Sequence, residues 1–253
     1  MKPRVIPVLS LKNGGLVKTR RYQDSKYVGD PTNAIRIFNE KEVDELVVLD
    51  IGASSAGTTP DLDVVRLFAE ECFMPLTYGG GIQNMQQVER IFDLGIEKVS
   101  LQSAVLNDTR LIQDIARVYG QQSVVLGVDI KKNWLKQPKL YSSQSGKLLN
   151  RPIYDYLAER VDAGVGEVLL SAVDHDGMMD GYDLDLIHSV ASRLPVPVVA
   201  LGGARSMDDF NLALKAGASA VAAGAMFVFK GPHRAVLINY PKRAEFDSLD
   251  DIE

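Results

Sequence analysis

The sequence predicts a single (β/α)₈ barrel, or TIM barrel, built from two repeated half-barrels. Two glycine-rich segments repeat each other at an offset of 122 residues, MPLTYGGG at 74–81 and VPVVALGG at 196–203. The same offset relates Glu45 to Glu167, well outside those segments. Each half alternates short β-branched runs with helical stretches, the pattern of consecutive βα units on a parallel sheet. Four units in each half give eight, which suits a closed barrel.

The composition fits one globular domain and excludes several classes of partner. A chain of 253 residues suits a one-domain barrel, and no linker separates the half-barrels, expected at about 1–122 and 123–241. A net charge of −5 lacks the excess of basic residues that is typical of nucleic-acid-binding proteins. Cys72 is the lone cysteine, which excludes an intramolecular disulfide. No signal-peptide pattern or membrane-spanning apolar run is present, which favours a cytoplasmic protein without a membrane partner.

The elements of the barrel follow one another in order. The first helix has a clear start signal, because Asp30 can cap it and Pro31 suits its first turn. The seventh and eighth strands come last, each with a glycine-containing end. We expect the first six strands at 5–9, 45–50, up to residue 78, 98–101, 124–129 and 167–171, and helices at 31–39, 61–71, 85–94, 108–119 and 153–163.

The loop after the first strand, residues 10–30, is long for a compact domain. One interpretation is a lid that brings the cations of Lys18, Arg20, Arg21 and Lys26 over a substrate. The other is a solvated basic loop. The sequence favours neither over the other.

Two further stretches depart from the βα pattern. Residues 131–151 are too polar for the core and too long for a simple turn, which predicts a short hairpin excursion. Trp134 is its expected packing anchor, and the alternative is that Trp134 contacts a ligand. The acidic tail at 242–253 lacks apolar periodicity. We expect this tail to be frayed.

Four short segments would present backbone N–H groups at strand ends beside helix starts, a geometry that binds phosphate. A single glycine pair is weak evidence, because glycine also serves tight turns. The same arrangement at two sites across a pseudo-twofold predicts a small-molecule ligand with a phosphate at each end. The candidate residues are Gly202, Gly203, Ala223 and Gly224 in the second half, and Gly80, Gly81, Gln102 and Ser103 in the first.

Asp129 ends the fifth strand, which places a carboxylate at the mouth between the two phosphate sites, where it can act as a general acid or base. The alternative is a carboxylate that only caps nearby N–H groups. The counterpart of Asp129 in the first half is Ser10, at the end of the first strand. Of these two equivalent positions, only the one at Asp129 therefore carries a carboxylate. Asp176, after the sixth strand, is the remaining carboxylate there.

A set of charged residues is predicted at the opposite end, the floor of the barrel. Glu45, Lys98 and Glu167 begin the second, fourth and sixth strands, and alternate strands share one layer of side chains. Ala220 is too small to complete this layer, but Arg4 can fill the gap. One interpretation is a stabilising ion-pair ring, which position alone favours. The other is a polar plug that something small could pass.

At these residues the sequence resembles, over nearly its full length, the cyclase subunit of imidazole glycerol phosphate synthase. The resemblance implies a lyase or synthase subunit of a glutamine amidotransferase complex. In that family a glutaminase subunit docks at the barrel bottom as a heterodimer and supplies ammonia through a gate, which Arg4, Glu45, Lys98 and Glu167 match. Asp129 matches one of two catalytic aspartates. Lys18 matches a substrate-holding loop lysine, and Asp50, Ser171, Asp176, Gly177, Gly202 and Gly203 fall on site motifs.

The departures from the family pattern concern the mouth. The other catalytic aspartate is Ser10, two phosphate-binding residues are replaced by Gln102 and Gly224, and a family arginine is His175. This combination, with the ending at 229–240, resembles second-copy homologues found with bacterial surface-polysaccharide (lipopolysaccharide) genes. Those homologues work with a glutaminase homologue and a third enzyme that amidinates a sugar.

Three functions therefore remain open. The first is a subunit that channels ammonia for amidino-sugar formation, which Ser10 favours. The second is a working cyclase of histidine biosynthesis, and the third is a non-catalytic activator of the glutaminase. None of these requires a cofactor or a metal ion, and we expect neither.

Overall fold

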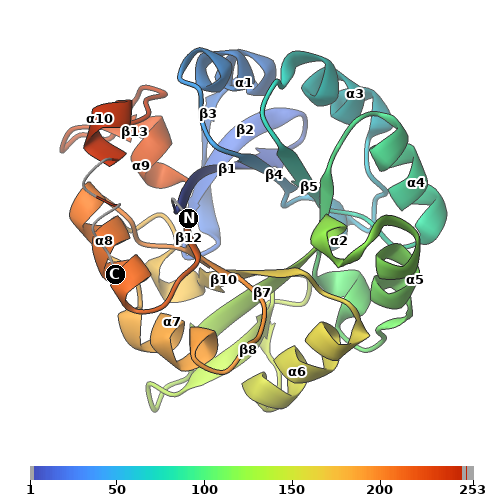
Figure 1. Ribbon diagram of the computed structural model, residues 1–253. Coiled ribbons are helices and arrows are strands. Elements are labelled where there is room, and N and C mark those ends of the chain that lie inside the picture. Colours follow the sequence, from blue (N-terminus) through green and yellow to red (C-terminus); the bar gives the residue numbers. More distant parts are fainter. Residues whose placement is uncertain (1–2, 247–248, 250–253) are drawn as a thin grey trace.

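The computed structural model describes residues 3–246 and Leu249, and its centre is a closed parallel barrel (Figure 1). Each strand pairs with the next around the ring, and the pairings of β12 with β1 and of β7 with β10 complete the closure. This confirms the predicted (β/α)₈ fold. The strands are β1 (Arg4–Lys12), β4 (Leu46–Asp50), β5 (Leu76–Gly79), β6 (Lys98–Leu101), β7 (Val124–Lys132), β10 (Glu167–Ala172), β11 (Val198–Leu201) and β12 (Ala220–Ala223).

An outer ring of helices surrounds the strands (Figure 1). Several helix starts use the same device in both halves of the chain. Asp61 and Asp183, 122 residues apart, each cap a helix with the side-chain carboxylate, and Asn84 and Ser206 form a second such pair. The helices are α1 (Pro31–Glu40), α2 (Ala53–Ala56), α3 (Leu62–Glu71), α4 (Met85–Asp93), α5 (Arg110–Tyr119), α6 (Ile153–Ala163), α7 (Leu184–Ala191), α8 (Met207–Lys215), α9 (Ala225–Val228) and α10 (Arg243–Phe246).

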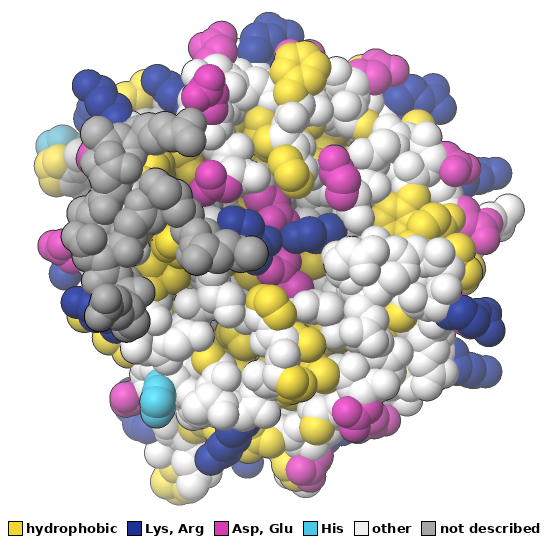
Figure 2. Space-filling view, viewed as in Figure 1, with side chains coloured by type: hydrophobic (Ala, Val, Ile, Leu, Met, Phe, Trp, Pro, Cys, Tyr) yellow, Lys and Arg dark blue, Asp and Glu magenta, His cyan; other side chains and the backbone are white. Residues whose placement is uncertain are grey.

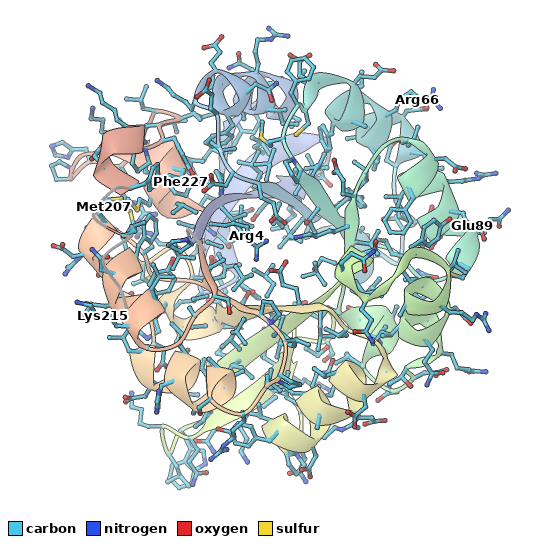
Figure 3. All side chains as sticks on the ribbon, in the orientation of Figure 1. Arg4, Arg66, Glu89, Met207, Lys215 and Phe227 are labelled. Atoms are coloured by element: carbon cyan, nitrogen blue, oxygen red, sulfur yellow. The ribbon has the colours of Figure 1, made fainter. Side chains whose placement is uncertain are left out.

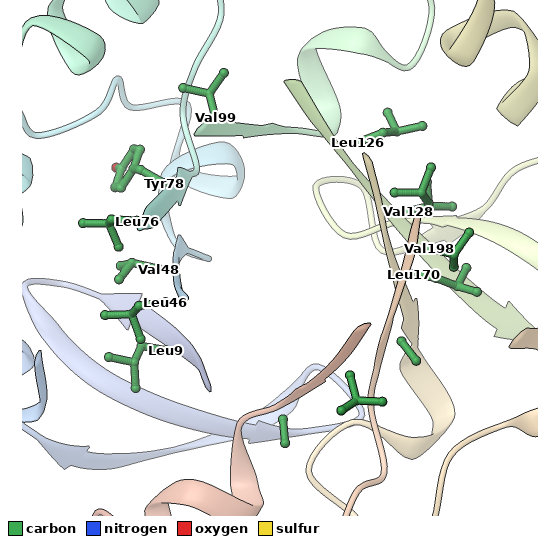
Figure 4. Close-up of a cluster of buried hydrophobic side chains, with 14 of the residues drawn as sticks. Leu9, Leu46, Val48, Leu76, Tyr78, Val99, Leu126, Val128, Leu170 and Val198 are labelled. Atoms are coloured by element: carbon green, nitrogen blue, oxygen red, sulfur yellow. The ribbon is translucent and has the colours of Figure 1, made fainter. Parts of the chain in front are cut away.

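The core has two layers because successive strand residues point to opposite faces of the sheet. In β4, Leu46 and Val48 pack outward against the helices, whereas Val47 packs inside the barrel. Figure 4 shows the outward layer around the strands. The inner layer is small and aliphatic, and its fully buried members are Ile6, Val8, Val47, Val125, Leu169, Val199, Ala220 and Ala222.

The loop predicted after the first strand is ordered as a β-hairpin. Strands β2 (Gly15–Arg20) and β3 (Gln23–Gly29) pair with each other, and β2 continues the sheet from β1. The hairpin turns at Arg21 and Tyr22, with φ of 53° and 62°. Such a turn usually carries Asn or Gly. Because neither residue type is present at the turn, the sequence did not predict this hairpin.

The predicted excursion at 131–151 is present as a hairpin, formed by the end of β7 with β8 (Pro138–Ser142) and β9 (Lys147–Leu148). The predicted role of Trp134 is wrong. Its side chain is 86% exposed at the turn, and Leu140, at 2%, is the residue that anchors the hairpin in the core.

The chain after β12 covers part of the outer surface. A short hairpin of β13 (Phe229–Lys230) and β14 (Ala235–Val236) precedes α10, and the ring of Phe246 contacts that of Tyr240. Leu249 is buried. The tail is therefore packed rather than frayed at these positions, and residues 247–248 and 250–253 lie outside the described part of the chain. Among the described residues, no helix has the length and apolarity needed to cross a membrane.

Candidate functional site

A cavity of about 370 Å³ lies at the carboxyl ends of the strands, and the tip of the β2–β3 hairpin covers it. The cavity brings together most of the residues predicted for the mouth. They are Ser10, Lys18, Asp50, Gly80, Gly81, Gln102, Ser103, Asp129, Ser171, Asp176, Gly202 and Gly224. The remaining predicted residues, Gly177, Gly203 and Ala223, line a small hollow beside it, next to Lys18.

Asp129 is buried near the end of β7, where neutral groups surround its carboxylate. The hydroxyl of Tyr22 donates a hydrogen bond to Asp129 Oδ1 at 2.7 Å. Gln102 also hydrogen-bonds this carboxyl group, and the Ser143 hydroxyl beside it donates to Gln102 Oε1 at 2.6 Å. Burial raises the pKa of Asp129 to about 6, although the neighbouring Tyr22, Gln102 and Ser143 side chains oppose this rise. A carboxyl group with such a pKa can accept or donate a proton near neutrality.

Lys18 lies over the second-half glycine site and is paired with Asp176. Its Nζ is 2.5 Å from Asp176 Oδ1, and the hydroxyl of Thr19 donates to Asp176 Oδ2 at 2.6 Å. A Cβ atom added to Gly224 would lie 3.3 Å from Cε of Lys18, so the glycine leaves room for the lysine stem. The φ of Gly224 is −109°, which any residue can adopt. Space, rather than backbone conformation, is therefore what this glycine provides.

The two glycine pairs have the same local geometry. Gly80 and Gly202 have φ of 119° and 103°, which residues with a side chain rarely adopt. A Cβ atom on Gly80 would lie 2.4 Å from the carbonyl oxygen of Asp50, and one on Gly202 2.8 Å from that of Ala172. Both strand ends therefore require a glycine that lets two backbone segments approach. The two sites differ beside the glycines, because Lys18 flanks the second and Gln102 lines the first.

Asp50 and Ser10 occupy the mouth beside the first-half site. The carboxylate of Asp50 accepts hydrogen bonds from the N–H groups of Gly52 and Ala53 at 3.0 and 3.1 Å, at the start of α2. Burial raises the pKa of Asp50. Ser10 is buried in β1, between Val17 of β2 and Leu49 of β4. It places a hydroxyl, not a carboxylate, on the cavity.

The four charged residues of the floor form a closed ring. Arg4 donates to both Glu45 and Glu167, and Lys98 Nζ lies 2.9 Å from Glu45 and 3.1 Å from Glu167. Burial alone would raise the pKa of Glu167, but Arg4 and Lys98 outweigh it and hold that pKa below its usual value. Figure 2 shows basic and acidic side chains meeting at the centre of the barrel, where Figure 3 labels Arg4.

A hydroxyl group lies directly above this ring. The hydroxyl of Thr77, which is fully buried in β5, donates to Glu45 Oε1 at 3.1 Å. Ser100, in the neighbouring strand β6, lines the mouth cavity. β6 begins with the ring residue Lys98, so the strand that supplies this residue also lines the cavity two residues further on.

Some features of the mouth differ from the sequence expectation. His175 contacts Asp180, with Nδ1 3.0 Å from its Oδ1, and does not line the cavity. Tyr22 and Ser143 lie against Asp129 and Thr19 contacts Asp176, and the sequence predicted a site role for none of the three. No motif marks them. In the described part of the chain, no three His, Cys, Asp or Glu side chains are grouped to hold a metal ion.

Residues 4–232 match the model of a protein family described as histidine biosynthesis protein. The chain belongs to this family. Two relatives carry the name "Putative imidazole glycerol phosphate synthase subunit", HisF of Leptospira interrogans and hisF2 of Pseudomonas aeruginosa. They are 44% and 47% identical, and each alignment covers 98% of this chain and 99% of the relative. The imidazole glycerol phosphate synthase subunit HisF of Exiguobacterium sibiricum is 37% identical, over 88% of this chain and 90% of its own.

Proposed function

We propose that this chain is the barrel subunit of a glutamine amidotransferase. It takes ammonia from a glutaminase subunit docked on the floor and passes it through the barrel to the mouth. There it serves the amidination of a sugar in surface-polysaccharide biosynthesis. The observation that carries the proposal is the closed ring of Arg4, Glu45, Lys98 and Glu167.

The ring is a poor device for stability alone. Glu45 and Glu167 are almost fully buried, and removing charges from water costs free energy that their pairing only partly returns. Apolar residues of similar volume would close the floor at least as well. The ring instead supplies hydrogen-bond donors and acceptors to a small polar molecule, and Thr77 continues them inward. This supports passage of ammonia rather than a purely structural role.

The mouth supports a phosphorylated ligand and a reaction that differs from ring closure. Two glycine sites flank Asp129, and its pKa of about 6 suits proton transfer near neutrality. Ser10 provides no second acid at the position of the family's other catalytic aspartate. We infer that ammonia leaves the mouth for an acceptor other than the histidine-pathway substrate, with a separate sugar-amidinating enzyme as the receiving protein.

The test of docking uses a glutaminase subunit from the same organism. Mixing the two should give a heterodimer by analytical ultracentrifugation and raise the rate of glutamine hydrolysis. Lys98→Met should reduce the stimulation, whereas Lys215→Met, which removes an exposed lysine on α8, should not. Absence of a complex at micromolar concentrations would contradict the proposal.

A further inference from the structure

Tyr22 is an unassigned residue that contacts the central carboxyl group of the mouth. It lies at the tip of the β2–β3 hairpin, and its hydroxyl is 2.7 Å from Asp129 Oδ1. Ser171 of β10 hydrogen-bonds the same phenol oxygen. The three side chains form a short chain of hydrogen bonds from one strand end to the next. Among the residues that the structure describes, no other residue of the hairpin forms a hydrogen bond with Asp129.

The position of Tyr22 is fixed from several sides. The backbone N–H of Arg21 donates to the carbonyl of Asp176 at 2.8 Å, and its Nε donates to the carbonyl of Asp174 at 3.0 Å. The ring of Tyr22 meets that of Tyr141 edge-on, with centroids 6.3 Å apart. Tyr141 belongs to the excursion hairpin, so both extra hairpins contribute to one contact. Both turn residues keep positive φ values, which such tertiary contacts can maintain.

Few charged or titratable groups face Asp129. Asp176, after β10, opposes its ionisation, although Lys18 partly neutralises Asp176. Tyr156 of α6 is influenced by the charge of Asp129, and Tyr22 is in direct contact. Burial, together with the charges of Asp129 and Asp176, raises the pKa of Tyr22 well above its usual value. Tyr22 is therefore a hydrogen-bond donor, and not an anion, throughout the neutral range.

We propose that Tyr22 is the positioning residue of Asp129, orienting its carboxylate and favouring its charged form while the hairpin covers the mouth. The inference rests on the proposed function, in which Asp129 is the acid–base group of the mouth. Tyr22 remains protonated, so no proton leaves it. A hydrogen bond to the charged form favours that form, which keeps buried Asp129 able to accept a proton. Ser10, the counterpart of Asp129 in the first half-barrel, has no charge with which to orient the Asp129 carboxylate.

The test is the titration of Asp129, followed through its side-chain carboxyl carbon by nuclear magnetic resonance and assigned by its loss in Asp129→Asn. The midpoint should lie near pH 6 in the unmodified protein. Tyr22→Phe keeps the ring against Tyr141 but removes the donor, so the midpoint should rise by about one pKa unit. Tyr27→Phe, the matched change at an exposed tyrosine of the same hairpin, should leave it unchanged.

A second variant shifts the midpoint in the opposite direction. Fluorotyrosine at position 22 is a stronger hydrogen-bond donor, and it should lower the Asp129 midpoint while preserving the ring. An unchanged midpoint in both Tyr22 variants would overturn the inference. A purely structural role would change the melting temperature without these opposite shifts. The measurement uses no glutaminase, so it is independent of the docking experiment.

Discussion

At the floor, two carboxylates meet two cations, whereas at the mouth Asp129 meets a phenol, an amide and a hydroxyl. The charges of Arg4 and Lys98 hold the pKa of Glu167 below its usual value, and burial raises that of Asp129 to about 6. Glu167 at the floor therefore keeps its charge at physiological pH, whereas Asp129 at the mouth titrates near neutrality. The same buried setting thus holds a fixed charged ring at one end and, at the other, a carboxyl group whose pKa suits proton transfer.

The largest expected effect tests whether the mouth has lost ring-closing chemistry. With the histidine-pathway substrate and ammonium salt, turnover should be severely impaired, because the resemblance implies a reaction with two carboxyl groups and Ser10 stands where one of them is expected. General acid–base groups contribute about 10²–10⁴-fold, so Ser10→Asp should restore a factor of that order. Ser10→Asn is the matched uncharged control and should restore nothing.

Two outcomes would change the interpretation of the mouth. Turnover by the unmodified protein at the rate of ordinary family members, or rescue of a histidine auxotroph that lacks its own cyclase, would favour the histidine-pathway function. Activity that stays absent in Ser10→Asp would indicate Gln102 and Gly224, which line the cavity, as the barriers instead.

The second prediction concerns the stability of the floor when one member of the charged ring is removed. Arg4→Met leaves Glu45 and Glu167 with Lys98 alone, and it should lower the free energy of unfolding by about 1–3 kcal/mol, because Arg4 is partly exposed. Urea unfolding at pH 7 measures the change. Arg66→Met, which removes an exposed ion pair with Asp63 at 3.8 Å, should cost less than about 0.5 kcal/mol.

The pH dependence of this loss has a definite sign. The pKa of Glu167 is lowered in the folded protein, so its contribution to stability is present above the unfolded carboxyl value of about 4.3 and is lost as the pH falls. The difference between Arg4→Met and the unmodified protein should therefore shrink between pH 6 and pH 3. A constant difference would mean that the ring is not what Arg4 stabilises.

The floor could be predicted from the sequence, but the cover of the mouth could not. Glu45, Lys98 and Glu167 stand at strand starts, and the alternation of barrel layers is enough to place them at a common level. Arg21 and Tyr22 form the turn, but neither is an Asn, Asp or Gly, the residue types that mark a two-residue hairpin turn in a sequence. Their conformation depends on contacts with the loop after β10, which lies far away in the sequence.

The third prediction concerns the free energy cost of burying Asp129. Its pKa is raised in the folded protein, so the free-energy cost of burying Asp129 grows as the pH rises from about 4 to about 6, is complete above pH 6 and is absent below about pH 4. Asp129→Asn should therefore stabilise the fold at pH 8 by about 1–3 kcal/mol, with little gain at pH 4. Urea unfolding at both values tests this. A gain of equal size at both would show that charge is not its origin.

The smallest expected effect compares the two ends of the mouth with each other. Phosphate should bind the second-half site, where Lys18 lies beside Gly202 and Gly224, more tightly than the first-half site, where Gln102 already hydrogen-bonds Asp129 and Ser143. Titration of inorganic phosphate against the backbone amide resonances of each glycine pair reports the two affinities separately. Asp176 partly neutralises Lys18, so Lys18→Met should weaken the second site by a few-fold only, about 1 kcal/mol. Gln102→Ala should leave that site unchanged. Equal affinities, or tighter binding in the first half, would show that the lysine over Gly224 does not serve the anion, and that its pairing with Asp176 only fastens the hairpin.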